Sequence, residues 1–354
     1  MEQIKVKDFI ICASESVVYA MKKIDDNASG IVFVVDDEDK LIGSATDGDI
    51  RRWLIKTGNL DSEISQVMNC NTITIFENEI DKASEIIKIK KIRAIPVLTL
   101  DRKVKDVVLL DDSYIEKEKN VLNVLPDVDV VIMAGGQGTR LYPYTKILPK
   151  PLIPVGDVPI IERIIESFKK FGIRNFYVSV NYHKAMIKSY FSEIEKDYTL
   201  NYIEENMPLG TAGSLKLLGN VVNKPVFVTN CDILLLADYE DIYKYHINSQ
   251  NALTIVSSMK NITVPYGVIH SSEDGKIDLL EEKPQLSYFI NTGVYILNPE
   301  YIDMIPDNTF FHMPDLAALL IQAGKRVGMY PISEDSFLDM GELSEMRRME
   351  NHLK

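Results

Sequence analysis

Apolar residues recur at helical spacing in two stretches of the first third of the chain, and each stretch precedes a pair of apolar runs. The predicted helices carry the apolar sets Val17, Val18, Ala20, Met21, Ile24 and Ala83, Ile86, Ile87, Ile89. The runs that follow are 31–36 and 40–54 in the first copy and 94–98 and 103–112 in the second. We predict an internal duplication of a small βαβ-containing unit, and the two copies should pair because neither can bury a face alone.

From Val128 onward, runs rich in Val and Ile alternate with the helical stretches 160–171, 185–195 and 315–323. This alternation predicts an α/β, Rossmann-like domain with a mixed, mostly parallel sheet that is covered on both faces and binds ligands at the carboxyl ends of its strands. The segment 113–127 is charged and closes on Pro126, which is typical of a connector. We assign residues 1–120 to the duplicated module, 121–127 to a linker and 128–354 to the second domain.

Composition and charge narrow the class of protein. The chain has 354 residues, 46% of them hydrophobic, and a formal net charge of -13, which disfavours nucleic acid or an anionic membrane as a partner. The three cysteines are far apart, and the five histidines lack metal-ligand spacing, so each histidine should be solvated or lie in the core. We therefore expect reduced thiols, no zinc site and, since no leader or membrane-spanning stretch is visible, a cytoplasmic location.

A glycine-rich turn follows the apolar run at 129–134. Gly135, Gly136 and Gly138 lack side chains, so backbone N–H groups can approach phosphate oxygens, while Arg140 and Lys150 supply positive charge. The turn lacks the Gly-Lys-Ser/Thr ending of a Walker loop, and Leu141 stands where a dinucleotide fingerprint needs its third glycine. The pattern predicts a phosphate site of another kind.

The turn and six later motifs resemble the signature of bacterial sugar-1-phosphate nucleotidyltransferases over residues 128–345. The later motifs are 205–213, 230–232, 266–268, 282–284, 291–295 and 337–341, in the family's order. The resemblance implies attack of a sugar phosphate on the α-phosphorus of a nucleoside triphosphate, with release of pyrophosphate. Such a nucleophile is mostly dianionic at neutral pH, so positive charge and positioning are needed rather than a general base.

The resemblance also implies roles for particular residues. Arg140, Lys150 and Lys283 would be catalytic; Ala134, Gly135, Gly136, Gly138, Thr139, Glu205, Gly210 and Thr211 would bind the nucleotide; Gly267, Glu282 and Asn291 would bind the sugar. Asp232 and Asp339 would bind Mg²⁺, an ion that prefers a few carboxylates with phosphate oxygens and waters. Asp232 also follows an apolar strand, where an α/β sheet presents catalytic groups. Each aspartate could instead cap a helix or a turn, and each lysine could be a solvated surface charge.

The nucleotide base is predicted from Glu205. One carboxylate can accept both N1–H and N2–H of guanine, whereas uracil and thymine suit an amide, so GTP is favoured. Glu205 could also face solvent, and Glu204 is equally acidic. The alternatives are a uridylyl- or thymidylyltransferase acting on glucose 1-phosphate, and a non-catalytic, nucleotide-sensing regulatory subunit.

The duplicated module resembles a tandem pair of CBS domains, which sense adenine nucleotides or dimerise proteins. In that family a hydroxyl residue and an aspartate three residues later hold ribose and phosphate, and Thr46 and Asp49 fit this spacing. In the second copy Asp106 and Leu109 replace the expected residues, so the alternative is a degenerate pair kept only for homodimer contact. A CBS pair ahead of such an enzyme resembles glucosamine-1-phosphate guanylyltransferases of the legionaminic acid (flagellin glycan) pathway.

Overall fold

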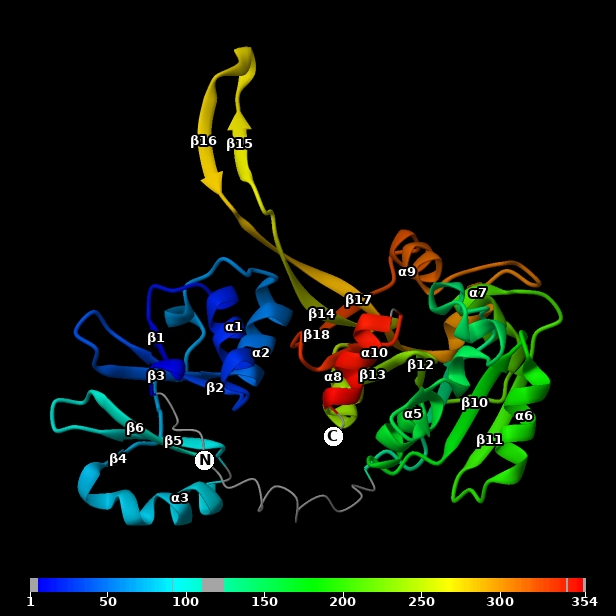
Figure 1. Cartoon of the computed structure of the whole chain (residues 1–354), viewed down its shortest axis with the longest axis horizontal. Helices are drawn as coiled ribbons and strands as arrows, with labels where there is room; N and C mark the ends of the chain where they lie inside the picture. Colours follow the sequence, from blue (N-terminus) through cyan, green and yellow to red (C-terminus); the bar gives the residue numbers. More distant parts are fainter. Residues whose placement is uncertain (1–5, 91, 110–123, 342, 353–354) are drawn as a thin grey trace. The chain divides into compact units, whose positions relative to one another are not determined.

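A computed structural model describes residues 6–90, 92–109, 124–341 and 343–352 (Figure 1). The chain divides into two compact units, Met1–Lys119 with Met259–Phe289, and Asn120–Ser258 with Ile290–Lys354. Residues 113–123 of the predicted connector 113–127, and with them 121–123 of the linker, lie outside the described residues. In the part of the chain that the structure describes, no helix has the length and apolar character needed to cross a membrane.

The first unit contains the predicted duplication. The first copy comprises β1 (Ile10–Cys12), α1 (Val17–Asn27), β2 (Ile31–Val35), β3 (Leu41–Thr46) and α2 (Asp47–Thr57). The second comprises β4 (Ile75–Phe76), α3 (Ala83–Lys90), β5 (Ala94–Leu98) and β6 (Val104–Leu109). Each copy forms a three-stranded sheet in which the first two strands are parallel and the last two antiparallel. The matching topology accounts for the repeated hydrophobic pattern.

The two copies share a core, as expected for units that cannot bury a face alone. Phe33 and Leu41 of the first copy lie in one cluster with Leu98 and Val107 of the second. The prediction that Ile89 belongs to the buried face of α3 was wrong, because the short helix fully buries only Ala83 and Ile87. Ile89 is 68% exposed.

A hairpin joins the first unit from far along the chain. The long strands β14 (Leu253–Thr263) and β17 (Gln285–Leu297) lead into and out of β15 (Gly267–Ser271) and β16 (Ile277–Glu282). Met259 on β14 is fully buried with apolar side chains of α1, β2 and α2, and Phe289 on β17 packs against the same cluster. The sequence pattern placed the hairpin in the second domain, because it carries no sign of contacts with residues more than 200 positions away.

The second unit confirms the predicted α/β fold with a mostly parallel sheet. Its order is β11-β10-β7-β12-β17-β14-β18, where β7 is Asp129–Met133, β10 Asn175–Val180, β11 Thr199–Glu204, β12 Val226–Asn230 and β18 Val327–Ile332. Strands β7, β10, β11 and β12 run parallel, and β17 runs antiparallel to β12. The principal helices are α5 (Ile160–Lys169), α6 (Lys184–Glu193), α8 (Tyr239–Asn248), α9 (Met313–Gln322) and α10 (Leu343–His352).

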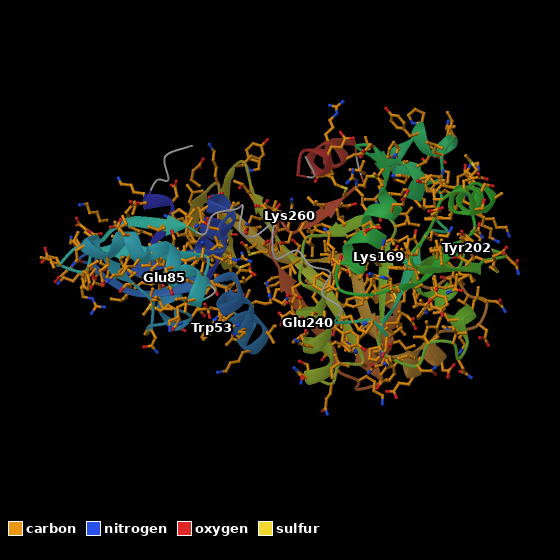
Figure 2. All side chains as sticks on the ribbon, turned by 90° about the horizontal axis from the view of Figure 1, so that it is seen from below. Trp53, Glu85, Lys169, Tyr202, Glu240 and Lys260 are labelled. Carbon is orange, nitrogen blue, oxygen red and sulfur yellow. The ribbon has the colours of Figure 1, made fainter. Side chains whose placement is uncertain are left out.

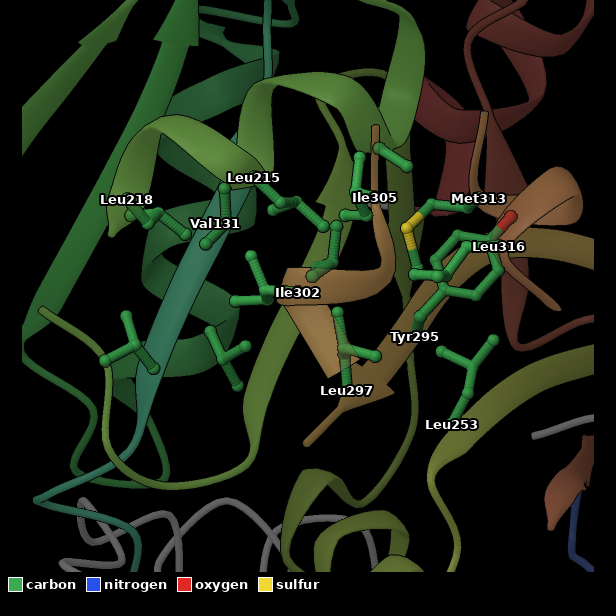
Figure 3. Close-up of a cluster of buried hydrophobic side chains, with 14 of the residues drawn as sticks. Val131, Leu215, Leu218, Leu253, Tyr295, Leu297, Ile302, Ile305, Met313 and Leu316 are labelled. Atoms are coloured by element: carbon green, nitrogen blue, oxygen red, sulfur yellow. The ribbon is translucent and has the colours of Figure 1, made fainter. Parts of the chain in front are cut away.

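Both faces of this sheet are packed, as alternation along β12 shows. Val226 and Val228 face a large cluster that includes Met313 and Leu316 of α9 (Figure 3). Phe227 points the other way, with its ring 5.3 Å from that of Phe168 on α5 and 5.6 Å from that of Tyr239 on α8. Polar side chains on the outer helices are partly exposed, such as Lys169 on α5, which pairs with Glu166 and Asp197, and Glu240 on α8, which pairs with Lys244 (Figure 2).

The sheet order fixes where a ligand site forms. After β7 the chain continues to β10 and β11 on one side, whereas β12 pairs with β7 on the other. Met133, at the end of β7, is aligned with Asn230, at the end of β12. The glycine-rich turn and the segment Asn230–Asp232 therefore emerge side by side at a topological switch point, where open α/β sheets bind ligands.

Candidate active site

The glycine-rich turn leaves β7 and ends in a short 3-10 helix, Thr139–Leu141. Gly138 has φ +64°, and a Cβ there would lie 2.9 Å from Thr145 and 3.2 Å from Lys150. The Thr145 hydroxyl, which is fully buried, donates to the Gly138 carbonyl at 2.8 Å. The turn is thus held against the Thr145–Lys150 segment. Before the turn, the Ala134 N–H donates to the Ser179 carbonyl at 3.0 Å. Gly136 has open space around its missing Cβ.

Glu205 lies beneath this turn. It is 5% exposed, and a Cβ on Gly135 would lie 2.8 Å from its carboxylate. The carboxylate accepts from the Ser179 hydroxyl and, at 3.0 Å, from the Leu209 N–H. Glu204 is instead exposed and pairs with Lys184 and Lys188. The alternative that Glu205 faces solvent is wrong, because packing against the turn buries it.

Two aspartates meet across a short antiparallel pair that follows the switch point. Strand β13 (Ile233–Leu235) pairs with β19 (Phe337–Asp339), with Ile233 aligned to Asp339. The Asp232 carbonyl accepts the Met340 N–H at 2.9 Å, which fixes the two segments together. Burial raises the pKa of Asp339, and the charge of Asp232 raises it further.

Lys150 neutralises one of these carboxylates. Its ammonium contacts Asp232 in a pair whose side chains are only 10% and 8% exposed. Arg140 reaches the same carboxylate at 4.0 Å, with its own side chain 64% exposed. The interpretation of Lys150 as a solvated surface charge is wrong, because this pairing takes it out of water.

The donor set fits a hard divalent cation. Asp232 and Asp339 supply carboxylate oxygens, and a cation would relieve the repulsion by which the Asp232 charge raises the pKa of Asp339. No cluster of three or more His, Cys, Asp or Glu side chains suited to a metal occurs within the described residues. The neighbouring Cys231 thiol is buried, which raises its pKa to about 12, so it stays protonated and is a poor ligand.

A cavity of about 410 Å³ opens beside these aspartates. Its lining residues are Arg140, Thr211, Asn230, Asp232, Ile233, Asn291, Thr292, Gly293, Tyr295, His312, Pro314, Asp315, Phe337 and Asp339. Of the described residues that line it, Arg140 is the only lysine or arginine, against three aspartates. Binding phosphates there would therefore call for additional positive charge.

The predicted site residues divide among three places. Arg140, Thr211, Asp232, Asn291 and Asp339 line the cavity. Lys150 contacts Asp232 and lies beside Gly138 of the predicted nucleotide turn, whose Gly135 packs against Glu205. Gly267, Glu282 and Lys283 belong to the hairpin and hence to the other compact unit, whereas Gly210 packs against Phe311, next to the cavity residue His312.

The hairpin residues have local roles. Gly267 is aligned with Glu282 across β15 and β16, and a Cβ on Gly267 would lie 3.1 Å from the Glu282 carboxylate. Lys283 has φ +49° and donates its N–H to the Tyr266 carbonyl at 3.3 Å. All three are exposed, so their predicted contacts with sugar phosphate stay a prediction.

Sequence reasoning missed His312. We expected the histidines to be solvated or in the core, yet His312 lines the cavity with its Nδ1 3.3 Å from the Thr211 nitrogen. The available signal was its position immediately before α9, three residues ahead of Asp315. The buried His246 does fit the expectation, since it bonds Thr254 and Asn298 and burial lowers its pKa.

In the first unit, Thr46 and Asp49 form a capping box at the start of α2. The Thr46 hydroxyl accepts the Asp49 N–H at 3.2 Å and donates to its carboxylate at 2.6 Å, while the Thr46 N–H donates to the same carboxylate at 3.0 Å. This arrangement explains both residues without a ligand. Nucleotide binding there stays a prediction.

Known proteins resemble the two parts of the chain separately. A CBS domain model matches residues 2–56. The mannose-1-phosphate guanyltransferases of Debaryomyces hansenii and Saccharomyces cerevisiae are 39% and 38% identical over 184 residues, which are 49% of this chain and 51% of each relative. The chain thus spans about half the length of the curated relatives it matches.

A solved structure, that of HddC from Yersinia pseudotuberculosis, is 25% identical with a TM-score of 0.51, covering 64% of this chain and 100% of that one. This structural similarity agrees with the α/β fold and the mostly parallel sheet described above. The nucleotidyl transferase family model matches residues 129–354, which include the glycine-rich turn, Asp232 and Asp339. The chain belongs to the nucleotidyl transferase family.

Proposed function

We propose that the chain transfers a guanylyl group from GTP to a hexose 1-phosphate, giving a GDP-sugar and pyrophosphate. The observation that carries this proposal is the meeting of Arg140, Asp232 and Asp339 at one cavity beside the glycine-rich turn. A phosphate oxygen of the sugar would form a bond to the α-phosphorus of GTP while the bond to pyrophosphate breaks. The nucleophile is already ionised at neutral pH and needs no proton acceptor.

The residues of the chain would hold charge rather than move protons. Arg140, exposed at the rim, would contact the departing pyrophosphate. Lys150 would hold the Asp232 carboxylate in place and balance its charge, a role supported by their buried pair. Asp232 and Asp339 would hold Mg²⁺, which when bound supplies positive charge that offsets the repulsion between the reacting phosphates.

Guanine is the base best supported. Glu205 is buried against Gly135, as a base-reading group close to the nucleotide turn would be, and the curated relatives are guanyltransferases. Both carboxylate oxygens already accept one hydrogen bond, but each has a further lone pair. Two sugars deserve direct comparison. Glucosamine 1-phosphate follows from the resemblance to the legionaminic acid pathway, and mannose 1-phosphate is the sugar in the relatives' names.

The first unit would regulate the enzyme or dimerise it. The CBS match supports an adenine nucleotide as ligand near Thr46 and Asp49, with a coupling free energy to the catalytic reaction. The shared core of the two copies supports a module that folds as one body. Light scattering of the full chain, with and without adenine nucleotide, tests the homodimer.

A panel of turnover measurements tests the proposed activity. Pyrophosphate release would be measured for GTP, UTP, dTTP and CTP, each with glucose, mannose and glucosamine 1-phosphate and Mg²⁺. We expect GTP to give the highest kcat/KM with at least one of the sugars. Faster release with UTP or dTTP would reject the guanine assignment, and no release with any pair would indicate a non-catalytic subunit.

A further inference from the structure

The Gly210–Gly213 turn, α7, is packed directly against the segment that precedes α9. Ala212 and Gly213 donate their N–H groups to the Phe311 carbonyl at 2.9 and 3.1 Å, and Phe311 donates to the Leu209 carbonyl at 2.9 Å. A Cβ on Gly210 would lie 2.5 Å from the Phe311 carbonyl oxygen, and one on Gly213 would lie 2.6 Å from the Thr309 carbonyl oxygen. These two glycines are therefore required for the approach of this backbone, whatever else the motif binds.

This packing fixes the tautomer of His312. The Thr211 N–H donates to His312 Nδ1 at 3.3 Å, and the Thr211 hydroxyl lies 3.3 Å from the same atom. The hydroxyl oxygen accepts the Met313 N–H at 3.0 Å, which leaves its hydrogen free to point to the ring. An amide N–H only donates, so Nδ1 must accept and carry no proton. The neutral imidazole then carries its hydrogen on Nε2.

The ring is also restrained on its other sides. The Phe310 ring contacts it edge-on with centroids 4.7 Å apart, and the His312 main-chain N–H donates to the Asp315 carboxylate at 2.9 Å. The next residue, Met313, is fully buried beside Tyr295 in the core (Figure 3). A donor held this way loses little entropy when it binds a ligand.

The Nε2–H of His312 is an uncommitted donor at the cavity. No hydrogen bond to this atom occurs between residues that the structure describes, whereas other polar groups nearby are partly engaged. Asn291, for example, donates to the Tyr295 hydroxyl at 2.6 Å and accepts the Gly293 N–H at 3.0 Å. Asp232 and Asp339 on the lining are acceptors and are assigned to the cation.

We propose that His312 determines sugar specificity by donating its Nε2–H to one oxygen of the hexose 1-phosphate, either a ring hydroxyl or an acyl carbonyl. This inference rests on the proposed function and assigns the residue that reads the acceptor sugar. A donor cannot bind a protonated amine, so the sugar carbon that faces His312 carries oxygen and not an ammonium group. The Gly-Thr-Ala-Gly motif then serves the sugar site by positioning this ring.

Variants of the full chain test the proposal. His312→Phe keeps a flat ring but removes both nitrogens, and His312→Gln returns an N–H donor. With the best sugar 1-phosphate from the panel, we expect His312→Phe to raise the sugar KM about tenfold or more and to leave the GTP KM within about twofold. His312→Gln should recover part of this loss. Asp307→Asn, an exposed change in the same loop, is the matched control. Thermal melting of each variant checks that it folds.

Monodeoxy sugar 1-phosphates give a sharper readout. For the wild type, one deoxy position should cost about tenfold in kcat/KM, and that position should cost almost nothing further in His312→Phe, whereas other positions should cost the same in both. An unchanged sugar KM, or equal penalties at every position in both proteins, overturns the role of His312 while the enzyme itself remains active. If the wild type turns over no sugar 1-phosphate at all, the proposed function fails and this inference fails with it.

Discussion

The Lys150 ammonium contacts the Asp232 carboxylate in a buried ion pair that joins residues 82 positions apart. The pair links the end of the glycine-rich segment to the strand terminus that carries the proposed cation ligand. One buried charge therefore supports the other, and neither can be removed without leaving its partner unpaired in a poorly hydrated place.

Lys150→Met should lower both stability and turnover. Removing one member of a buried pair costs about 3 kcal/mol or more, and loss of a group that supports transition-state charge costs about a hundredfold in kcat. Denaturant unfolding in EDTA and in Mg²⁺ measures the first effect, and Mg²⁺ should recover part of the loss by neutralising Asp232. The exposed Lys146→Met is the matched control and should change stability by less than about 0.5 kcal/mol.

The double variant Lys150→Met with Asp232→Asn should be more stable than the sum of its single changes implies, because no uncompensated charge remains. If the changes in unfolding free energy of the two single variants add up to that of the double variant, the two side chains do not interact in solution.

Asp339→Asn should stabilise the cation-free protein while abolishing Mg²⁺-dependent turnover. Burial and the Asp232 charge raise the pKa of Asp339 in the folded state, so its ionised form opposes folding. A carboxyl group whose pKa is higher in the folded than in the unfolded protein stabilises the fold at low pH, where it is protonated. This stabilisation is lost as the pH rises through the pKa of the folded protein. The variant should therefore exceed the wild type in unfolding free energy most at neutral pH, in EDTA.

That advantage should shrink as pH falls through the carboxylate range, where wild-type Asp339 becomes protonated and resembles asparagine. Chemical unfolding at a series of pH values gives the measurement. A variant that is less stable than the wild type at neutral pH in EDTA would contradict the proposed repulsion between the two aspartates.

Glu205→Gln should reduce the preference for GTP. The amide cannot accept two guanine donors at once, so the ratio of kcat/KM for GTP to that for UTP should fall about tenfold or more, equivalent to about 1.4 kcal/mol. It should also cost about 1–3 kcal/mol of stability, since one of the bonds from Ser179 and Leu209 is lost. Glu204→Gln, which frees only surface lysines, should leave the ratio unchanged. Equal ratios in all three proteins would remove Glu205 from base recognition.

Thr46→Ala separates capping from ligand binding. Loss of the α2 cap should cost about 1 kcal/mol, and so should Ser16→Ala, which removes the hydroxyl that caps α1 by accepting the Tyr19 N–H at 3.2 Å. If adenine nucleotides bind near Thr46, only Thr46→Ala should abolish the rise in Tm that AMP, ADP or ATP produces. No such rise in the wild type would leave the capping box as the sole role of Thr46 and Asp49.

Local patterns in the sequence determined most of the architecture. The spacing of apolar residues predicted α1, α5 and α6 to within a few residues, because burying one face of a helix requires that spacing. The glycines, the strand-end Asp232 and the alternation of strands with helices similarly predicted a phosphate site at the carboxyl edge of a parallel sheet, because these features act over a few neighbouring residues.

Only the tertiary structure decided how distant segments meet. It placed Thr211 against His312, 101 positions away, buried Glu205 beneath Gly135 and paired Lys150 with Asp232. It also packed Met259 and Phe289 into the core of the first unit. These contacts depend on the order of strands in the sheet and on which distant segments pack against each other. Neither leaves a periodic signal along the sequence.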